Sequence, residues 1–150
     1  MTLPKTVTTT KTQDVFRVIL GSFMILAAAG HLTFQRGEFQ AQVPDWVPVS
    51  KDLVVILSGI VEAMLGIWMV FLTRWKVYAG ITLAIFYVLV FPGNIAQYTE
   101  HRTAFGLDTD QKRFIRLFFQ PVLIIWALWS TGALTALRFV GGQKKLSGQD

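Results

Sequence analysis

Four apolar stretches constrain this chain more than any other feature of its sequence. They lie at about 15–34, 53–72, 77–96 and 114–137, and short polar segments separate them. A helix of about 20 apolar residues crosses the hydrocarbon layer of a bilayer, which is about 30 Å thick. The sequence therefore predicts an all-α integral membrane protein, a four-transmembrane-helix bundle that forms one domain over residues 14–137.

The composition supports a membrane location and excludes several other classes of protein. Hydrophobic residues make up 53% of the chain and charged residues 15%, which is too apolar for an ordinary soluble domain. The basic residues lie in short clusters at the ends of the apolar stretches, so the net charge of +5 does not indicate nucleic-acid binding. The absence of cysteine excludes disulfides, thiol catalysis and iron–sulfur sites, and no haem or nucleotide motif is present.

The polar segments outside the apolar stretches have separate expected roles. Residues 1–13 are rich in threonine and show no apolar period, so we expect a mobile tail. Residues 138–150 are polar and are expected to form a loose C-terminal tail. Prolines on either side of Trp46 prevent a regular helix in the 35–51 segment, and the tryptophan suits a membrane interface. We expect this segment to lie across the mouth of the bundle.

The first apolar stretch has a second interpretation. Basic residues precede a short apolar core, and Ala27-Ala28-Ala29 matches the small-residue site at which a signal peptide is cleaved. The apolar character continues past these alanines through Leu32 and Phe34, which favours a retained helix. We therefore predict a transmembrane helix here, with the signal peptide as the alternative.

The basic residues indicate which side of the membrane each end of the bundle faces. Four spans place both termini on one side, and basic residues concentrate on the cytoplasmic side of a membrane protein. Those on the side of the termini outnumber those on the other side: Lys5, Lys11, Arg17, Arg74, Lys76, Arg138, Lys144 and Lys145, against Arg36, Lys51, Arg102, Lys112, Arg113 and Arg116. We therefore expect cytoplasmic N- and C-termini in the cell (inner) membrane.

One carboxylate interrupts the second apolar stretch. Glu62 lies roughly 13 Å into the hydrocarbon layer, close to its midplane, and a charge there is costly. Ser58 precedes it by one helical turn, and each other stretch carries polar side chains in the same outer half. Because such groups cost less when they face the bundle interior than when they face lipid, the sequence predicts a polar pocket that opens outward. Its candidate residues are Glu62, His31, Asn94, Gln120, Ser58 and Gln97.

Structural roles stay open for these residues. The alternative for Glu62 is a neutral carboxylic acid that hydrogen-bonds across helices, and the alternative for His31 is an interfacial histidine without a special role. The amides are equally consistent with hydrogen bonds that hold the helices together. One histidine and one glutamate lack further ligands at the usual spacing, so no metal is assigned, and no residue is assigned as catalytic.

Several short motifs stand at corresponding places along the four stretches. They are Gly30-His31, Leu57-Ser58-Gly59 followed by Glu62 and Gly66, Phe91-Pro92-Gly93-Asn94, and Gln120-Pro121. Together they resemble the DoxX-like family of small four-helix bacterial membrane proteins, over about residues 15–134. Family patterns commonly have an alanine where this chain has Gly93. The resemblance implies a four-helix membrane bundle and a link to redox metabolism, through quinone-linked oxidation or redox partner proteins.

The pocket and the resemblance lead to one expected function and two alternatives. We expect a redox-associated protein whose pocket binds a quinone-like or other small amphipathic molecule, with Glu62 and His31 handling protons and the amides of Asn94 and Gln120 orienting the ligand. The electron donor is then a partner protein. The first alternative is a non-enzymatic assembly or interaction protein for another membrane complex. The second is a small transporter that works as a homo-oligomer.

Overall fold

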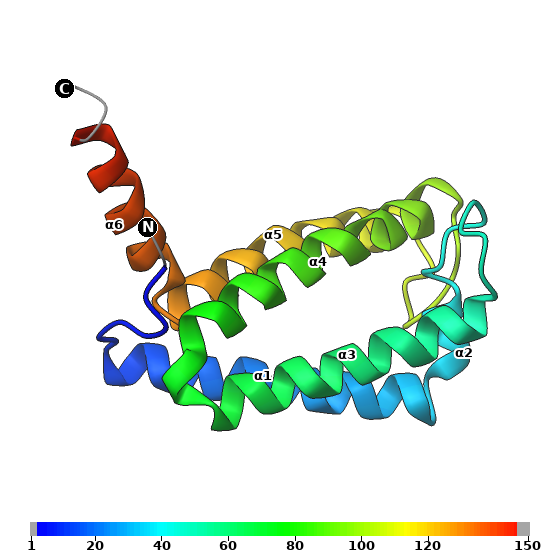
Figure 1. The fold of residues 1–150 in the computed structure, drawn as a ribbon. Coiled ribbons are helices and arrows are strands. Elements are labelled where there is room, and N and C mark those ends of the chain that lie inside the picture. The colour runs from blue at the N-terminus through cyan, green and yellow to red at the C-terminus, as the bar shows by residue number, and fades with distance from the viewer. Residues whose placement is uncertain (1–2, 147–150) are drawn as a thin grey trace.

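The four long helices run antiparallel and form a bundle (Figure 1). The computed structural model describes residues 3–146, and within them it contains helices and loops but no strand. The long helices are α1 (Lys11–Leu32), α3 (Lys51–Phe71), α4 (Lys76–Thr99) and α5 (Asp110–Ser130). The short elements are α2 (Arg36–Gln40), a 3₁₀ turn η1 (Thr73–Trp75) and α6 (Ala133–Leu146). Each long helix is long and apolar enough to cross a membrane, which confirms the all-α prediction and the number of such helices among the described residues.

Side-chain caps determine where three of the long helices begin. Thr10 accepts a hydrogen bond from the backbone N–H of Gln13, and the Gln13 side chain bonds back to the Thr10 N–H, which is a capping box. Ser50 accepts from the Leu53 N–H at 3.3 Å at the start of α3. At the start of α5, the Thr109 side chain accepts a hydrogen bond from the Lys112 N–H at 3.3 Å. The capping box explains why α1 begins at Lys11, four residues before the predicted start.

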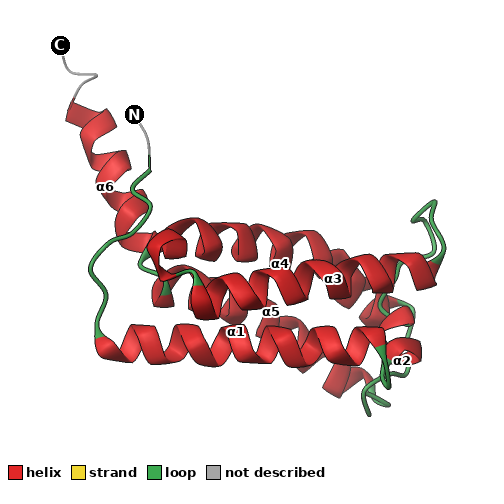
Figure 2. Cartoon of the chain, turned by 60° about the horizontal axis from the view of Figure 1, so that its bottom comes forward, coloured by secondary structure: helices red, strands yellow, loops and turns green. Residues whose placement is uncertain are grey.

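The fourth apolar stretch differs most from its predicted form. The sequence predicts one helix over 114–137 and a loose tail over 138–150, whereas α5 ends at Ser130 and α6 begins at Ala133. Gly132 separates them with φ +74°, a left-handed conformation that glycine adopts at little cost and that interrupts a helix. The new helix leaves the bundle at a steep angle (Figures 1 and 2). Residues 147–150 of the predicted tail lie outside the described part of the chain.

The N-terminal segment, for which the composition predicts a mobile tail, contacts the rest of the chain at several points. The Val77 N–H donates to the Lys5 carbonyl at 3.2 Å, and the Tyr78 hydroxyl donates to the Leu3 carbonyl at 2.8 Å. The Lys5 ammonium lies 4.1 Å from the centroid of the Trp75 ring. These contacts attach the segment to the start of α4. Residues 1 and 2 of the predicted tail lie outside the described residues.

The bundle consists of two helix pairs, α1 with α3 and α4 with α5. Gly21 and Gly66 face each other in the first pair, and neither position has room for a Cβ, so the two backbones lie in close contact. Gly59 contacts the Cβ of His31 in the same way. These contacts show that the small residues of the Glu62 helix let another helix pack closely against it, and that this helix is α1.

The apolar core fills one half of the bundle. It lies toward the end where α1 begins and α5 ends, and its buried members are Leu20, Met24, Leu65, Met69, Ala79, Leu83, Tyr87 and Ala127. The short helix α2 and the two long loops lie at the opposite end (Figures 1 and 2). In that half of the bundle, a cavity lies between the two helix pairs.

Candidate functional site

A cavity of about 470 Å³ lies between the two helix pairs. Both pairs line it, and so does the segment that follows α2, through Gln42, Val43, Pro44, Trp46 and Val47. Most of its lining is apolar. The polar side chains are few, and they are His31, Gln42, Ser58, Glu62, Asn94, Arg116 and Gln120. An apolar space with a small number of polar groups is typical of a site for a small molecule.

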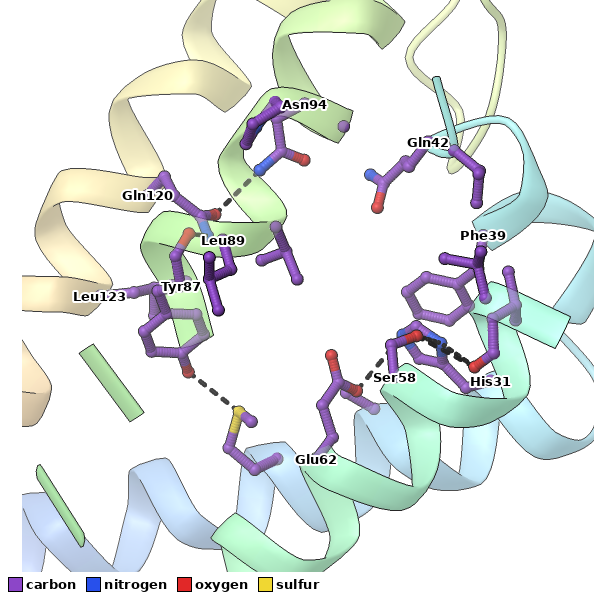
Figure 3. Close-up of a pocket in the computed structure, with 18 of the residues that line it drawn as sticks. His31, Phe39, Gln42, Ser58, Glu62, Tyr87, Leu89, Asn94, Gln120 and Leu123 are labelled. Atoms are coloured by element: carbon purple, nitrogen blue, oxygen red, sulfur yellow. Dashed lines mark hydrogen bonds and ion pairs between the residues drawn. The ribbon is translucent and has the colours of Figure 1, made fainter. Parts of the chain in front are cut away.

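The α1–α3 side of the cavity carries the titratable pair, and we call it the acid wall: His31, Ser58 and Glu62. The Nε2 atom of His31 lies 3.3 Å from Oε2 of Glu62, and both side chains are largely buried. The Nδ1 atom of His31 lies 3.1 Å from the Val55 carbonyl oxygen and 3.2 Å from the Ser58 hydroxyl. Figure 3 shows the Glu62 carboxylate directed into the cavity.

These contacts place two groups that can exchange a proton side by side. Nδ1 of His31 faces the Val55 carbonyl, which can only accept, so a hydrogen on Nδ1 suits this contact. Nε2 faces the Glu62 carboxyl group, and one proton between the two groups suits both atoms. The acid wall can therefore exchange a proton at the edge of the cavity.

The α4–α5 side is built from amides, and we call it the amide wall: Asn94 and Gln120. The Asn94 side-chain amide donates to Oε1 of Gln120 at 2.9 Å, and the Gln120 amide donates to the Tyr87 carbonyl at 2.7 Å. Gln120 is only 2% exposed. The Asn94 side-chain oxygen points into the cavity (Figure 3). The two amides satisfy each other, so this wall presents dipoles of constant orientation.

The segment from α2 to the start of α3 covers this end of the bundle, and we call residues 36–50 the lid. The Phe39 ring stacks on the His31 ring, with centroids 3.4 Å apart and an angle of 24° between the planes. On the other side, the Gln42 carbonyl lies against Gly93, where a Cβ would not fit. The lid therefore contacts both walls, in agreement with the position predicted for the proline-containing segment.

The structure brings five of the predicted residues to the cavity and places the sixth elsewhere. His31, Ser58, Glu62, Asn94 and Gln120 all contribute to the lining. Gln97 does not, which corrects its predicted position. It is buried behind the lid, where its Oε1 accepts from the Gln42 amide at 3.0 Å and its own amide donates to the Ala104 carbonyl at 3.4 Å. Gln97 lies near the C-terminal end of α4, where the loop after α4 folds back and brings the Ala104 carbonyl to its side chain. Its side chain therefore bonds to this loop and to the lid and does not reach the cavity.

Sequence reasoning missed other residues at the cavity. Arg116 lies at the start of the predicted fourth stretch and is counted with the basic residues of the outer side, but it is not among the predicted pocket residues, and it lines the cavity. Arg116 and Gln120 are four residues apart, so they lie on the same face of the helix. This spacing alone could have predicted that Arg116 faces the same pocket as Gln120. Phe39 and Gln42 carried no such signal, because the path of a loop follows from contacts distant in sequence.

The titratable groups of the cavity do not form a metal site. Within residues 3–146 no group of three histidine, cysteine, aspartate or glutamate side chains is placed to hold a metal ion. The chemistry that the arrangement offers is a mobile proton on the acid wall and oriented hydrogen-bonding groups on the amide wall, across an apolar space.

A family described as "Domain of unknown function (DUF8561)" matches residues 20–131 of the chain. No curated protein and no solved structure matches it. The matched residues include every residue that lines the cavity, and they leave out the N-terminal segment and α6.

Proposed function

We propose that this chain, which belongs to the DUF8561 family, is a multi-pass membrane protein whose cavity binds a small amphipathic molecule with a quinone-like head group. The family match contains every residue that lines the cavity. The helices α1, α3, α4 and α5 cross the cell (inner) membrane. The lid faces outward, and the ends where α1 begins and α5 ends face the cytoplasm. The excess of basic residues at that end supports this orientation.

One observation carries the proposal. Oε2 of Glu62 lies 3.3 Å from Nε2 of His31, so a carboxyl group paired with a histidine stands at the edge of a largely apolar cavity. The Glu62 carboxyl group is directed into the cavity (Figure 3), where it can bond to a hydroxyl or carbonyl of a bound head group. The apolar lining accepts the rest of the ligand.

The acid wall suits a ligand that gains or loses protons. Reduction of a quinone to a quinol takes up two electrons and two protons, and the proton held between His31 and Glu62 lies at the cavity surface. The chain has no cysteine, so the electrons come from a redox partner protein. The resemblance of its motifs to the DoxX-like family supports this redox association. The rival proposal, an assembly protein with a purely structural polar network, requires no ligand.

Ligand binding separates the two proposals. The purified protein in nanodiscs is titrated with decylubiquinone, a quinone with a short alkyl chain, and binding is followed by calorimetry and native mass spectrometry. We expect saturable binding that weakens about tenfold in Glu62→Gln, because the amide lacks the mobile proton and the charge. The matched control is Glu100→Gln, since Glu100 lies at the end of α4 outside the cavity.

An absence of saturable binding by the wild-type protein contradicts the ligand-binding function and favours the assembly role. An equal loss of binding in the Glu62 and Glu100 variants assigns the effect to surface charge instead.

A further inference from the structure

Arg116 is a second group at the cavity whose hydrogen-bonding capacity is unused. It lies on α5 one turn before Gln120 and contributes to the cavity lining. Its Nη1 atom is buried and has no hydrogen-bond partner among the described residues. The ion pairs formed by arginines within residues 3–146 involve Arg17, Arg36, Arg102 and Arg113, and none involves Arg116.

A neighbour on the same helix shows that the chain can satisfy a buried arginine. Arg113 is 5% exposed and donates to the Asp110 carboxylate at 2.7 Å, with further bonds to backbone carbonyls and to Thr103. Arg116 is half-buried, and its guanidinium has no ion-pair partner among the described residues to offset the cost of lost water at Nη1. Unlike Arg113, it therefore keeps donor capacity that a ligand in the cavity can use.

Glu62 and Arg116 line the same cavity from different helix pairs. Glu62 comes from α3, and its carboxyl group can accept a hydrogen bond or share a proton, whereas the guanidinium of Arg116 comes from α5 and can only donate. The carboxyl group is an acceptor for a ligand hydroxyl, and the planar guanidinium matches an oxyanion. A single occupant with an oxygen near each group can bond to both.

We infer that Arg116 anchors a negatively charged oxygen of the ligand, so the cavity takes an acidic amphiphile, an apolar body that carries an oxyanion. This inference rests on the proposed function and specifies the chemistry of its ligand. The oxyanion belongs either to a carboxylate, as in a fatty acid, or to the ionised hydroxyl of a hydroxyquinone. In both cases Arg116 selects the charged form over a neutral molecule of the same shape.

The test compares charged and neutral probes of matched size on the full chain in nanodiscs. Lauric acid and dodecanol form one pair, and 2-hydroxy-3-decyl-1,4-naphthoquinone and decylubiquinone form the other, at a pH where both acids are ionised. We expect the wild-type protein to bind each acid about tenfold more tightly than its neutral counterpart, which is the usual advantage of a charge-assisted pair. The pair that shows the larger preference identifies the source of the oxyanion.

Substitutions then assign the preference to one residue. Arg116→Met keeps the apolar stem and should lower the affinity for each acid by about tenfold, to that of its neutral counterpart, and Arg116→Lys should keep part of the preference. The matched control is Arg74→Met, because Arg74 is exposed and lies in η1 outside the cavity. The wild-type comparison needs no variant, so it decides the question even where Arg116→Met fails to fold.

Three outcomes overturn the inference: equal binding of charged and neutral probes by the wild-type protein, an unchanged preference in Arg116→Met, or an equal loss in Arg74→Met. If decylubiquinone still binds when one of these three outcomes is found, the inference about Arg116 fails but the proposed function is retained. Failure of all four probes to bind removes both.

Discussion

The acid wall and the amide wall face the same cavity but are built in opposite ways. On the amide wall, Asn94 and Gln120 bond to each other and to the backbone, so their hydrogen-bonding capacity is largely used within the protein. On the acid wall, Glu62 keeps a buried oxygen without an aligned hydrogen bond among the described residues. The difference teaches that polarity inside a bundle has two uses. Amides bonded to one another and to the backbone hold helices together, whereas an acid beside a histidine can exchange a proton with a ligand.

The largest expected effect tests which wall stabilises the fold. Gln120→Ala removes two interhelical hydrogen bonds and leaves the Asn94 amide and the Tyr87 carbonyl without their partner. We expect the free energy of unfolding to fall by about 2 kcal/mol, measured by denaturant titration in mild detergent. Glu62→Gln should change it by less than about 0.5 kcal/mol, because the contact of Glu62 with Nε2 of His31 is 3.3 Å long and poorly aligned. Equal losses in the two variants would remove the distinction between the walls.

A smaller effect tests how the lid joins the walls. In Gly93→Ala the added Cβ meets the backbone carbonyl of Gln42, which cannot rotate away as a side chain would. We expect a loss of about 1 kcal/mol and faster hydrogen exchange in the lid, because the contact with the amide wall opens first. Gly37→Ala is the matched control, since a Cβ there meets nothing within 4 Å. Unchanged exchange in Gly93→Ala would place the main attachment of the lid on the acid wall, at Phe39 and His31.

The smallest effect concerns the exposed ion pairs of the lid. Asp45 lies 2.6 Å from the Lys51 ammonium and 2.8 Å from the Arg102 guanidinium. The hydrogen bond from Lys51 holds the pKa of Asp45 below its ordinary value. A carboxyl with a lowered pKa stabilises the folded state above its ordinary pKa of about 3.9, and the contribution is lost as the pH falls below that value.

We therefore expect the protection of the lid amides, measured as exchange relative to the intrinsic rate at each pH, to be constant near neutral pH and to fall only in acid. Asp45→Asn should lower this protection at neutral pH by less than about twofold, because exposed pairs contribute little, and should remove the loss in acid that belongs to this group. A change in protection between pH 5 and 7 in the wild-type protein would indicate that another group controls the lid.

The helices were accessible from sequence because their causes are local. A run of apolar residues, the Ser50 cap and the spacing of Ser58 and Glu62 act within a few turns, so they could be read without knowing the fold. The break at Gly132 was missed because the apolar character continues through it into Leu137. Convergence of five predicted side chains on one cavity followed from the cost of facing lipid. The role of these side chains in binding stays a prediction.

The sequence by itself determined four long apolar helices and the polar positions in one half of them, since length, hydropathy and helical spacing are properties of each segment alone. Only the tertiary structure decided that α1 pairs with α3, through Gly21 and Gly66, and that α4 pairs with α5. That pairing separates the polar residues into two walls, brings Arg116 to the cavity and places Gln97 behind the lid. The physical reason is that close packing between distant segments depends on which surfaces fit, and no single segment contains that information.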